Sequence, residues 1–419
     1  MRSPGLRRIV GGMANLGARF NKLWAAVIVS NLGDGVMSVA FPLLVASITR
    51  DPVLVAGATV VGRIPWLLFA LPAGALVDRM DRRRVMVVVD WGRAVVVGVL
   101  GLLLLAGDVS LAIIYAIAFV LGSAETMFDT ASEALLPNIV GTDRLDAANG
   151  RLQAAEWATN TFVGPPFGAV LFGVAAAVPF LFDAGSFVLA AVLVSAIGGK
   201  FRGREASVAS GNLRTEIGDG MRWLWGHTVL RALAMMAGVT NLVGMGIIAI
   251  FVLFVQDILE LGDVGYGLIL ATIGLGGLIG SLTAPLVTRR FGQGTTLLGS
   301  VVGLGIGAVV MGSTSSAVVA ATVAGFYGLL IGLWNVVAIS LRQRLTPDEL
   351  RGRVSSVARL LAWGTQPVGA LLGGVVANFF GLRAPFFVAA VVWVLVFVVA
   401  APIVNNQRIA ALETEPARD

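Results

Sequence analysis

The sequence predicts an all-α membrane protein in which twelve transmembrane helices form two six-helix bundles. The chain of 419 residues is 57% hydrophobic and 13% charged, with a mean hydropathy of +0.89, far from the composition of a soluble domain. Twelve apolar segments have about the 20 residues that a helix needs to cross a bilayer. The longest polar stretch, residues 199–231, separates the first six segments from the last six.

The segments follow one another through short polar connections. In chain order they lie near residues 23–47, 53–77, 84–106, 111–134, 150–174, 177–198, 229–257, 264–288, 295–313, 316–341, 353–380 and 383–404. Asp34 and Pro42 interrupt the first segment, and no small-residue cleavage site follows it. We therefore expect this segment to remain as a helix instead of being removed as a signal peptide.

Basic residues alternate between the connections and predict the orientation. They are concentrated before the first segment, in the turn at 79–84, in the 199–231 stretch and in the turn at 342–353, whereas the alternate loops hold chiefly Arg50 and Arg383. Cytoplasmic loops carry an excess of Lys and Arg. Both termini are therefore predicted to lie in the cytoplasm, with the chain in the inner membrane. The net charge of +6 reflects this topology and does not indicate nucleic-acid binding.

Four parts of the chain follow from this pattern. We predict a first bundle at residues 1–198, a cytoplasmic linker at 199–228, a second bundle at 229–404 and a cytoplasmic tail at 405–419. Within the linker, the amphipathic stretch from Leu213 to Trp225 is expected to lie along the membrane surface.

A partial repeat relates the two bundles. Gly150-Arg151-Leu152 followed by Pro165-Pro166-Phe167-Gly168 recurs about 201 residues later as Gly352-Arg353-Val354 followed by Pro367-Val368-Gly369. Transporters are commonly built from such repeats, with the substrate site between the halves near the middle of the membrane.

Charged residues inside the apolar segments point to the functional site, because each costs several kcal/mol unless it is paired or faces water. The first bundle holds seven, namely Asp34, Arg63, Asp90, Arg93, Glu125, Asp129 and Glu133. The second bundle holds one clear case, Arg359. Ion coupling, if it occurs, is therefore expected in the first bundle.

Glu125, Asp129 and Glu133 are spaced four residues apart, which places them on one face of a helix. All three cannot be ionised in a dry interior, so either arginines neutralise them or one holds a proton. We expect Asp129 to pair with Arg93, and Glu133 to lie at the cytoplasmic end as a structural residue or part of a gate. Glu156 and Asp183 are interpreted as structural, and Asp183 is expected either to cap its helix or to face the outer cavity.

Two motifs resemble those of a known family. Gly74 to Val85 reads GALVDRMDRRRV, which resembles the cytoplasmic loop signature of the major facilitator superfamily, with Asp81 at a position where the family usually has glycine. The cluster Gly164-Pro165-Pro166-Phe167-Gly168 resembles the Gly-Pro motif of its antiporters. Prolines bend a helix and glycines allow close helix contact, so the cluster serves either gating or packing alone.

Longer runs narrow the resemblance to one branch. Four runs are similar to the branch that holds bacterial macrolide-type drug exporters and the enterobactin exporter. They read IPWLLFALPAGALVDRMDRRRVMVVVDWGRAVVVG, MFDTASEALLPNIV, LDAANGRL and VGPPFGAVL. The resemblance implies the major facilitator fold, with twelve helices in two bundles. It also implies a monomer that moves its substrate by alternating access.

The resemblance also assigns roles to residues. The first and fourth helices of the family line its central cavity, so Asp34 and Glu125 become the preferred proton carriers, with Arg63 biasing their protonation. The alternative is that Asp34 merely pairs with Arg63. The cytoplasmic gate would consist of Gly74, Asp78, Arg79, Arg83 and Glu133, and the antiporter-type motif of Gly164, Pro165 and Gly168.

Other classes of function find little support in the chain. It has no cysteine and a single histidine, His227 in the linker, so no catalytic thiol or metal cluster is expected. A channel would need polar residues on helices of both bundles. We therefore predict a secondary transporter without cofactor that exports a hydrophobic or amphipathic small molecule, such as a drug or siderophore, in exchange for protons.

An apolar second bundle facing acids in the first suits an amphipathic or cationic substrate. Candidate wall residues of the cavity in the second bundle are Met235, Met245, Phe251, Phe326 and Trp334. A lipid or lysolipid translocator of the same fold is the alternative function. A membrane scaffold or receptor that transports nothing would have no use for the buried acids.

Overall fold

The computed structural model describes residues 16–107, 109–141, 144–199, 201, 213–347 and 350–414, and every regular element in them is a helix. The first half contains α2 (Ala18–Ile48), α3 (Pro52–Arg79), α4 (Arg82–Ala106), α5 (Leu111–Val140), α6 (Leu145–Glu156), the π-helix η2 (Trp157–Val163), α7 (Gly164–Val174) and α8 (Val178–Ser195). α6, η2 and α7 follow one another without a break.

The second half begins after the linker helix α9 (Leu213–Gly226). It contains α10 (Thr228–Ile248), α11 (Phe251–Leu253), the π-helix η3 (Phe254–Ile258), α12 (Asp263–Phe291), α13 (Gln293–Ser313), α14 (Ala317–Leu345), α15 (Arg351–Gly364), α16 (Gln366–Phe380), α17 (Ala384–Ala400) and α18 (Asn406–Thr414).

Ten helices of the described residues are long and apolar enough to span a membrane. The continuous segment α6–η2–α7 and the shorter apolar helix α17 bring the count to the predicted twelve. The all-α membrane fold is thus confirmed. The linker stretch that was expected to be amphipathic forms α9, which packs against α15 and α10.

Two predicted helices are divided. Only Thr365 separates α15 from α16 within residues 353–380, which still count as one span, whereas the other division is wider. Residues 229–257 were expected to form a single helix, but α10 ends at Ile248 and the chain turns before α11 and η3. No glycine or proline marks the turn at Ala249 and Ile250. Residues 249–255 are all buried, so we attribute the break to tertiary packing, which overrides local propensity.

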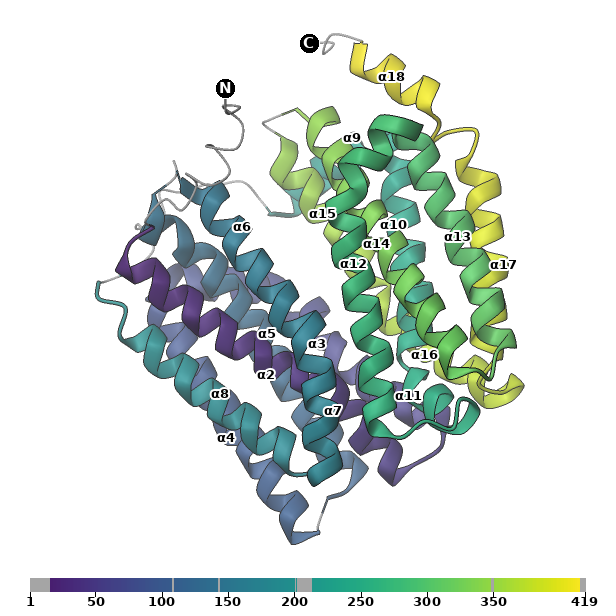
Figure 1. Cartoon of the computed structure of the whole chain (residues 1–419). Helices are drawn as coiled ribbons and strands as arrows, with labels where there is room; N and C mark the ends of the chain where they lie inside the picture. Colours follow the sequence, from purple (N-terminus) through teal and green to yellow (C-terminus); the bar gives the residue numbers. More distant parts are fainter. Residues whose placement is uncertain are drawn as a thin grey trace, which may run out of the picture.

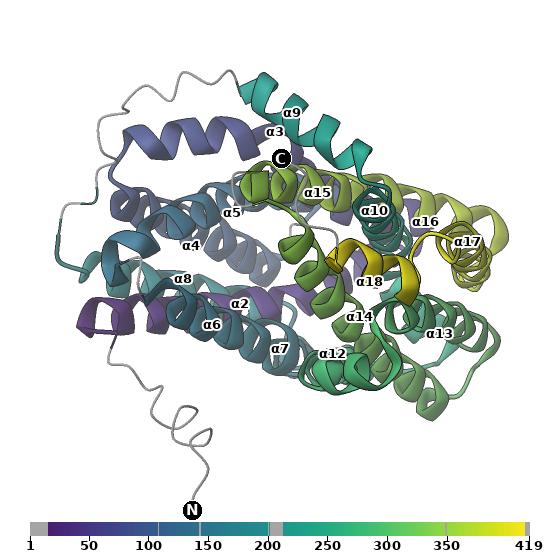
Figure 2. The ribbon, with the colours of Figure 1, turned by 90° about the horizontal axis from the view of Figure 1, so that it is seen from above.

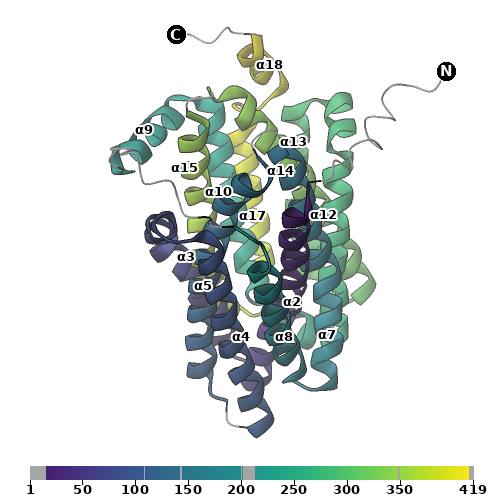
Figure 3. The ribbon, with the colours of Figure 1, turned by 90° about the vertical axis from the view of Figure 1, so that its left-hand side faces the viewer.

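The two halves lie side by side, with α2 to α8 on one side and α10 to α17 on the other (Figure 2). α9 and α18 lie at the same end of the molecule, which Figures 1 and 3 place at the top. We call this end the termini side and the opposite end the far side.

Three hydrophobic cores show how the halves meet. One core is shared, because it joins residues 37–46 of α2 and Val55 of α3 to residues 249–255, Ala370 and Ala377 of the second half. A second core contains only residues of the second half and Leu224 of α9, and a third only residues of the first half and Phe201. The third core includes Val77, at the termini end of α3. The halves are therefore fused towards the far side and separately packed towards the termini side.

Small residues allow close approach in both seams between the halves. A Cβ added to Gly374 of α16 would lie 2.7 Å from Cβ of Ala56 in α3. A Cβ added to Gly267 of α12 would lie 2.5 Å from Cβ of Ala169 in α7. Small-residue contacts of this kind are the usual means of close helix packing in membranes.

The same device joins α12 to α14 within the second half. A Cβ on Gly328 would overlap the carbonyl oxygen of Ile273, and a Cβ on Gly280 that of Leu329. Gly299 of α13, by contrast, has open space around it.

We predict that Gly328→Ala lowers the unfolding free energy by about 1–3 kcal/mol, because an overpacked contact must spread. Gly299→Ala is the matched control and should be neutral or slightly stabilising, since alanine favours a helix over glycine. Thermal unfolding of both variants in detergent measures the difference. Equal melting temperatures for the two variants would contradict the packing assigned to α12 and α14.

Candidate functional site

A single buried arginine lies at the centre of the charged residues of the first half. Arg93 of α4 is 3% exposed, and its guanidinium lies 5.2 Å from the ring centroids of both Phe128 and Phe187. It interacts electrostatically with four carboxyl groups, those of Asp34, Asp90, Asp129 and Asp183. These acids come from four different helices, α2, α4, α5 and α8.

None of the four carboxyl groups forms a direct ion pair with Arg93 among the described residues. The expected Arg93–Asp129 pair is therefore not formed. Asp129 is exposed on α5, whereas Arg93 lies between two phenyl rings and its Nη2 has no hydrogen-bond partner. One guanidinium thus attracts several carboxyl groups at longer range and forms a direct ion pair with none of the four.

Asp34 is positioned by the glycines on either side of it. A Cβ on Gly33 would overlap the side chains of Asp183 and Ser186 in α8. A Cβ on Gly35 would lie 2.7 Å from the carbonyl oxygen of Asn160 in η2. Only glycine fits at these two contacts, so α2 is held closely between α8 and η2 with Asp34 at the contact.

Asp183 is a site residue that the sequence interpretation treated as structural. It lies inside α8, after an N-cap at Ala177, and is therefore not a cap. It is 1% exposed and accepts a hydrogen bond of 2.9 Å from the Ser186 hydroxyl. The available signal was a carboxylate in an apolar segment, which also singled out Asp90.

A cavity of about 290 Å³ collects most of these groups. Its charged and amide wall residues are Asp34, Arg63, Arg93, Glu125, Asn160 and Asp183. Arg63 and Asp34 share the cavity but form no ion pair, so the simple pairing of these two residues is not found. Ala249 of the second half also lines this cavity, from the turn that enters the shared core.

The second half holds a larger cavity of about 590 Å³ with a different character. Two predicted wall residues, Met245 and Trp334, line it, together with Asn241, Arg342 and Arg359, and no acidic residue is among its wall residues. At one side it is bounded by Trp363, whose ring lies 5.1 Å from that of Trp66 in the first half.

The other predicted wall residues lie elsewhere. Met235 and Phe326 are each 50% exposed and line neither of these two cavities. Phe251 lies in the shared core, with its ring centroid 6.5 Å from that of Phe386.

An amide pair recurs in both halves. Asn160 of η2 donates to Asn31 of α2 at 3.4 Å, and Gln366 of α16 donates to Asn241 of α10 at 3.0 Å. Asp34 stands three residues after Asn31 in the first half, and Gly244 stands three residues after Asn241 in the second. The two halves therefore share a scaffold but carry the acid on one side only.

Comparison with known proteins agrees with this architecture. Residues 12–417 match the MFS_3 family, described as transmembrane secretion effector. The chain belongs to this family. It is a branch of the major facilitator superfamily, which confirms the resemblance drawn from the motifs.

Two relatives are drug efflux proteins by name. The chain is 29% identical to the multidrug efflux pump Tap of Mycolicibacterium fortuitum, over 90% of this chain and 93% of that protein. It is 22% identical to macrolide efflux protein A of Streptococcus pyogenes, over 93% and 96% of the two chains.

Solved structures show the same fold. A bacterial homologue of the human lysosomal transporter Spinster, in an inward-facing and occupied conformation, aligns with a TM-score of 0.73 at 12% identity. The alignment covers 99% of this chain and 100% of that one. The chain is thus a transporter-family protein with many membrane spans.

The family loop motif is held by bonds within the first half. Arg83 donates to the carbonyl oxygen of Ile197 at 2.6 Å, just beyond the end of α8. Asp81 caps α4 by accepting from the backbone N–H of Arg84, with φ −73°, so its conformation does not require glycine. Arg79 is exposed, and the side chain of Asp78 lies outside the described part of the structure.

Two further members of the predicted gate lie on α3 and α5. Gly74 is half-buried in α3 and has open space around its Cα. Glu133 precedes Ala134, whose carbonyl oxygen accepts a hydrogen bond of 3.0 Å from Arg82 in the loop motif, and the Glu133 side chain pairs at 3.7 Å with Arg359 of α15, across the two halves. Glu125, Asp129 and Glu133 are all exposed on α5, as their spacing predicts for one face of the helix.

The Gly-Pro cluster forms a close contact with α2. A Cβ on Gly164 would lie 2.5 Å from Cα of Gly35, and a Cβ on Gly168 would lie 2.5 Å from the carbonyl oxygen of Val36. Pro165 and Pro166 have no backbone N–H, and the helix runs as the π-helix η2 immediately before them. The contact therefore reaches the residues that hold Asp34.

We predict that Gly164→Leu abolishes dye export while membrane insertion is kept, because the added side chain must push α7 away from Asp34. Gly173→Leu is the matched control in the same helix, since Gly173 has open space around it. Export of a fluorescent dye from cells, normalised to the amount of protein in the membrane, compares the two variants. Full export by Gly164→Leu would refute the link between this contact and transport.

Proposed function

We propose that this protein exports an amphipathic small molecule across the inner membrane in exchange for protons, by alternating access. The observation that carries the proposal is the shared arginine, with one buried guanidinium for the acids of four helices. The efflux proteins among its relatives support export of a drug-like molecule. The protein works without a cofactor and as a monomer.

The excess of acids over cations supports proton binding. Asp34, Glu125 and Asp183 share the first-half cavity with two cations, Arg63 and Arg93, and Asp90 is buried nearby. These four acids cannot all be ionised, because unpaired charges are costly inside a membrane. Some of them therefore hold protons when the cavity contains no cation. A cationic substrate that enters the cavity releases these protons, and protons that return release the substrate.

The wall residues support the substrate class. The first-half cavity offers carboxyl groups. The second-half cavity offers methionine, tryptophan and aliphatic side chains beside Arg342 and Arg359, with no acid among its wall residues. A molecule with an apolar body and a positive group can satisfy both walls. A lipid or lysolipid would use the same apolar wall and remains the alternative cargo.

The placement of the arginines and lysines supports an orientation with the termini side in the cytoplasm. The shared core then closes the outer side, and the separate cores leave the inner side divided. The structure described here would accordingly be the inward-open state.

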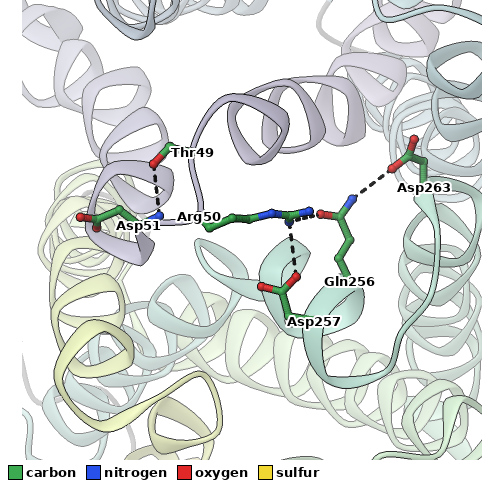
Figure 4. A network of polar contacts seen from close by, with 6 residues as sticks. All are labelled: Thr49, Arg50, Asp51, Gln256, Asp257 and Asp263. Atoms are coloured by element: carbon green, nitrogen blue, oxygen red, sulfur yellow. Dashed lines mark hydrogen bonds and ion pairs between the residues drawn. The ribbon is translucent and has the colours of Figure 1, made fainter.

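A polar network on the far side supports alternating access (Figure 4). Arg50, between α2 and α3, donates to the Gln256 side chain at 2.6 Å and pairs with Asp257 at 3.5 Å. Gln256 in turn donates to Asp263 at 3.0 Å, so the first half is tied to η3 and α12 of the second. Opening the far side breaks these bonds. Breaking and making such contacts needs only a few kcal/mol of differential interaction.

The proposed proton-carrying residues, Asp34 and Glu125, are tested by reconstituting the protein in liposomes with a pH gradient. We expect gradient-driven movement of ethidium by the wild type and its loss in Asp34→Asn or in Glu125→Gln, because each removes an exchangeable proton. Glu260→Gln, which changes an exposed acid near the far side, should transport normally. A lipid analogue is followed in parallel. Two outcomes would contradict proton-coupled export of a small molecule. One is ethidium flux that is unchanged by the pH gradient and by both substitutions, and the other is flux of the lipid analogue alone.

The far-side network is tested by distance measurement. The chain has no cysteine, so Ala175→Cys and Ser316→Cys place single spin labels on far-side turns of the two halves. Arg50→Ala should raise the outward-open population about fivefold, since exposed pairs contribute up to about 1 kcal/mol. Arg383→Ala is the control, because Arg383 donates at 2.7 and 2.9 Å to carbonyl groups of Gly312 and Thr314 within its own half. Identical distance distributions for wild type and Arg50→Ala would overturn the assignment.

A further inference from the structure

Asp90 is a titratable group that the proposed transport cycle does not use. It is 0% exposed, and neither of its carboxyl oxygens has a hydrogen-bond partner. It is not among the wall residues of the first-half cavity. Burying an ionised carboxylate without a partner costs several kcal/mol, so its environment demands either a proton or a cation.

The charged groups around Asp90 come from each neighbouring helix. Arg93 lies one turn further along α4, and it attracts Asp90 electrostatically, while Asp34 of α2 repels it. Asp183 of α8 interacts with it as well, whereas Glu125 and Asp129 are exposed on α5. Arg93 is therefore the cation available to Asp90, and Asp34 competes for it.

Arg93 is held in a way that permits movement. Residues three apart on a helix have Cβ atoms about 5–6 Å apart, so a change of side-chain rotamer brings Arg93 to Asp90. Nη2 of Arg93 and both oxygens of Asp90 are unpartnered. The rings of Phe128 and Phe187 hold the guanidinium by cation–π contacts, which a new ion pair can replace.

We propose that Asp90 is a second proton-binding residue of the transport cycle, and that it shares one proton and one counter-ion, Arg93, with Asp34. In the state described here Asp90 holds the proton, while Asp34 is ionised and faces Arg93 and the cavity. In the other state Asp34 holds a proton, Asp90 has released one, and Arg93 pairs with Asp90. The proposal rests on the proton-coupled export argued above and adds a residue to it.

The exchange keeps the charge of the buried cluster constant. Both states contain one ionised carboxylate, one carboxylic acid and one guanidinium, so the net charge of these three groups is zero in both states. A cationic substrate stabilises the first state, because it adds a second partner for ionised Asp34. A proton that binds Asp34 favours the second state, in which Asp34 is neutral and no longer binds a cation.

Infrared spectroscopy of the protein in nanodiscs, without substrate, tests the proposal. A carboxylic acid has a carbonyl stretching band that a carboxylate lacks, and an acid without a hydrogen bond absorbs at the high-frequency end of that range. We expect such a band at neutral pH in the wild type and its absence in Asp90→Asn. We also expect its absence in Asp34→Asn, because the uncharged asparagine leaves Arg93 to Asp90, which then ionises.

Glu260→Gln is the control and should leave the band unchanged. A wild-type spectrum without the band, or a band that survives in Asp90→Asn, would overturn the proton on Asp90. A band that disappears in Asp90→Asn but persists in Asp34→Asn would overturn the sharing of Arg93.

Because the spectra need no substrate, they separate this proposal from proton-coupled export. If the wild type shows the band but no gradient-driven flux in the liposome assay, the proposed function is rejected and the protonated Asp90 stands. If the wild type shows gradient-driven flux but no band, the proton on Asp90 is rejected and the proposed function stands.

Discussion

One buried arginine with too many acids around it is the constraint on which the rest of the site depends. Arg93 lies within electrostatic range of carboxyl groups on α2, α4, α5 and α8 and pairs directly with none of them among the described residues. Inside a membrane, an arrangement of this kind requires protons or a bound cation to complete it. The same imbalance that makes the site costly to bury gives it a reason to exchange protons for substrate.

Close helix packing makes this arrangement reproducible. Gly33 and Gly35 bring α2 against α8 and η2, and Gly164 and Gly168 bring α7 against α2, so the backbone around Asp34 has little freedom. The second half uses the same design, in which Gly369 and Gly373 of α16 meet the backbone of α10. It carries no acid at the equivalent point. A similar scaffold in both halves thus presents acids on one wall of the central space and, on the other, apolar side chains with Arg342 and Arg359 but no acid.

Hydropathy and charge spacing predicted most of the fold, because a membrane helix must satisfy its backbone and hide its polar groups within its own segment. The break after Ile248 could not be predicted, since packing in the shared core decides it. The residues Asp90 and Asp183 could be flagged as buried charges, but not placed around Arg93. The partner of Glu133 is Arg359 of the other half, a contact set by how the two halves meet. Asp81 fits the loop because the backbone there has an ordinary negative φ.

The most direct test of the shared arginine is the number of protons released when a cation binds. Tetraphenylphosphonium carries no titratable proton, so any change in a pH indicator after its addition to the weakly buffered protein in nanodiscs comes from the protein, once empty nanodiscs are subtracted. The account predicts proton release by the wild type and much less by Asp34→Asn. Saturating binding of the cation with no proton release would contradict it, because the acids around Arg93 would then hold no exchangeable proton.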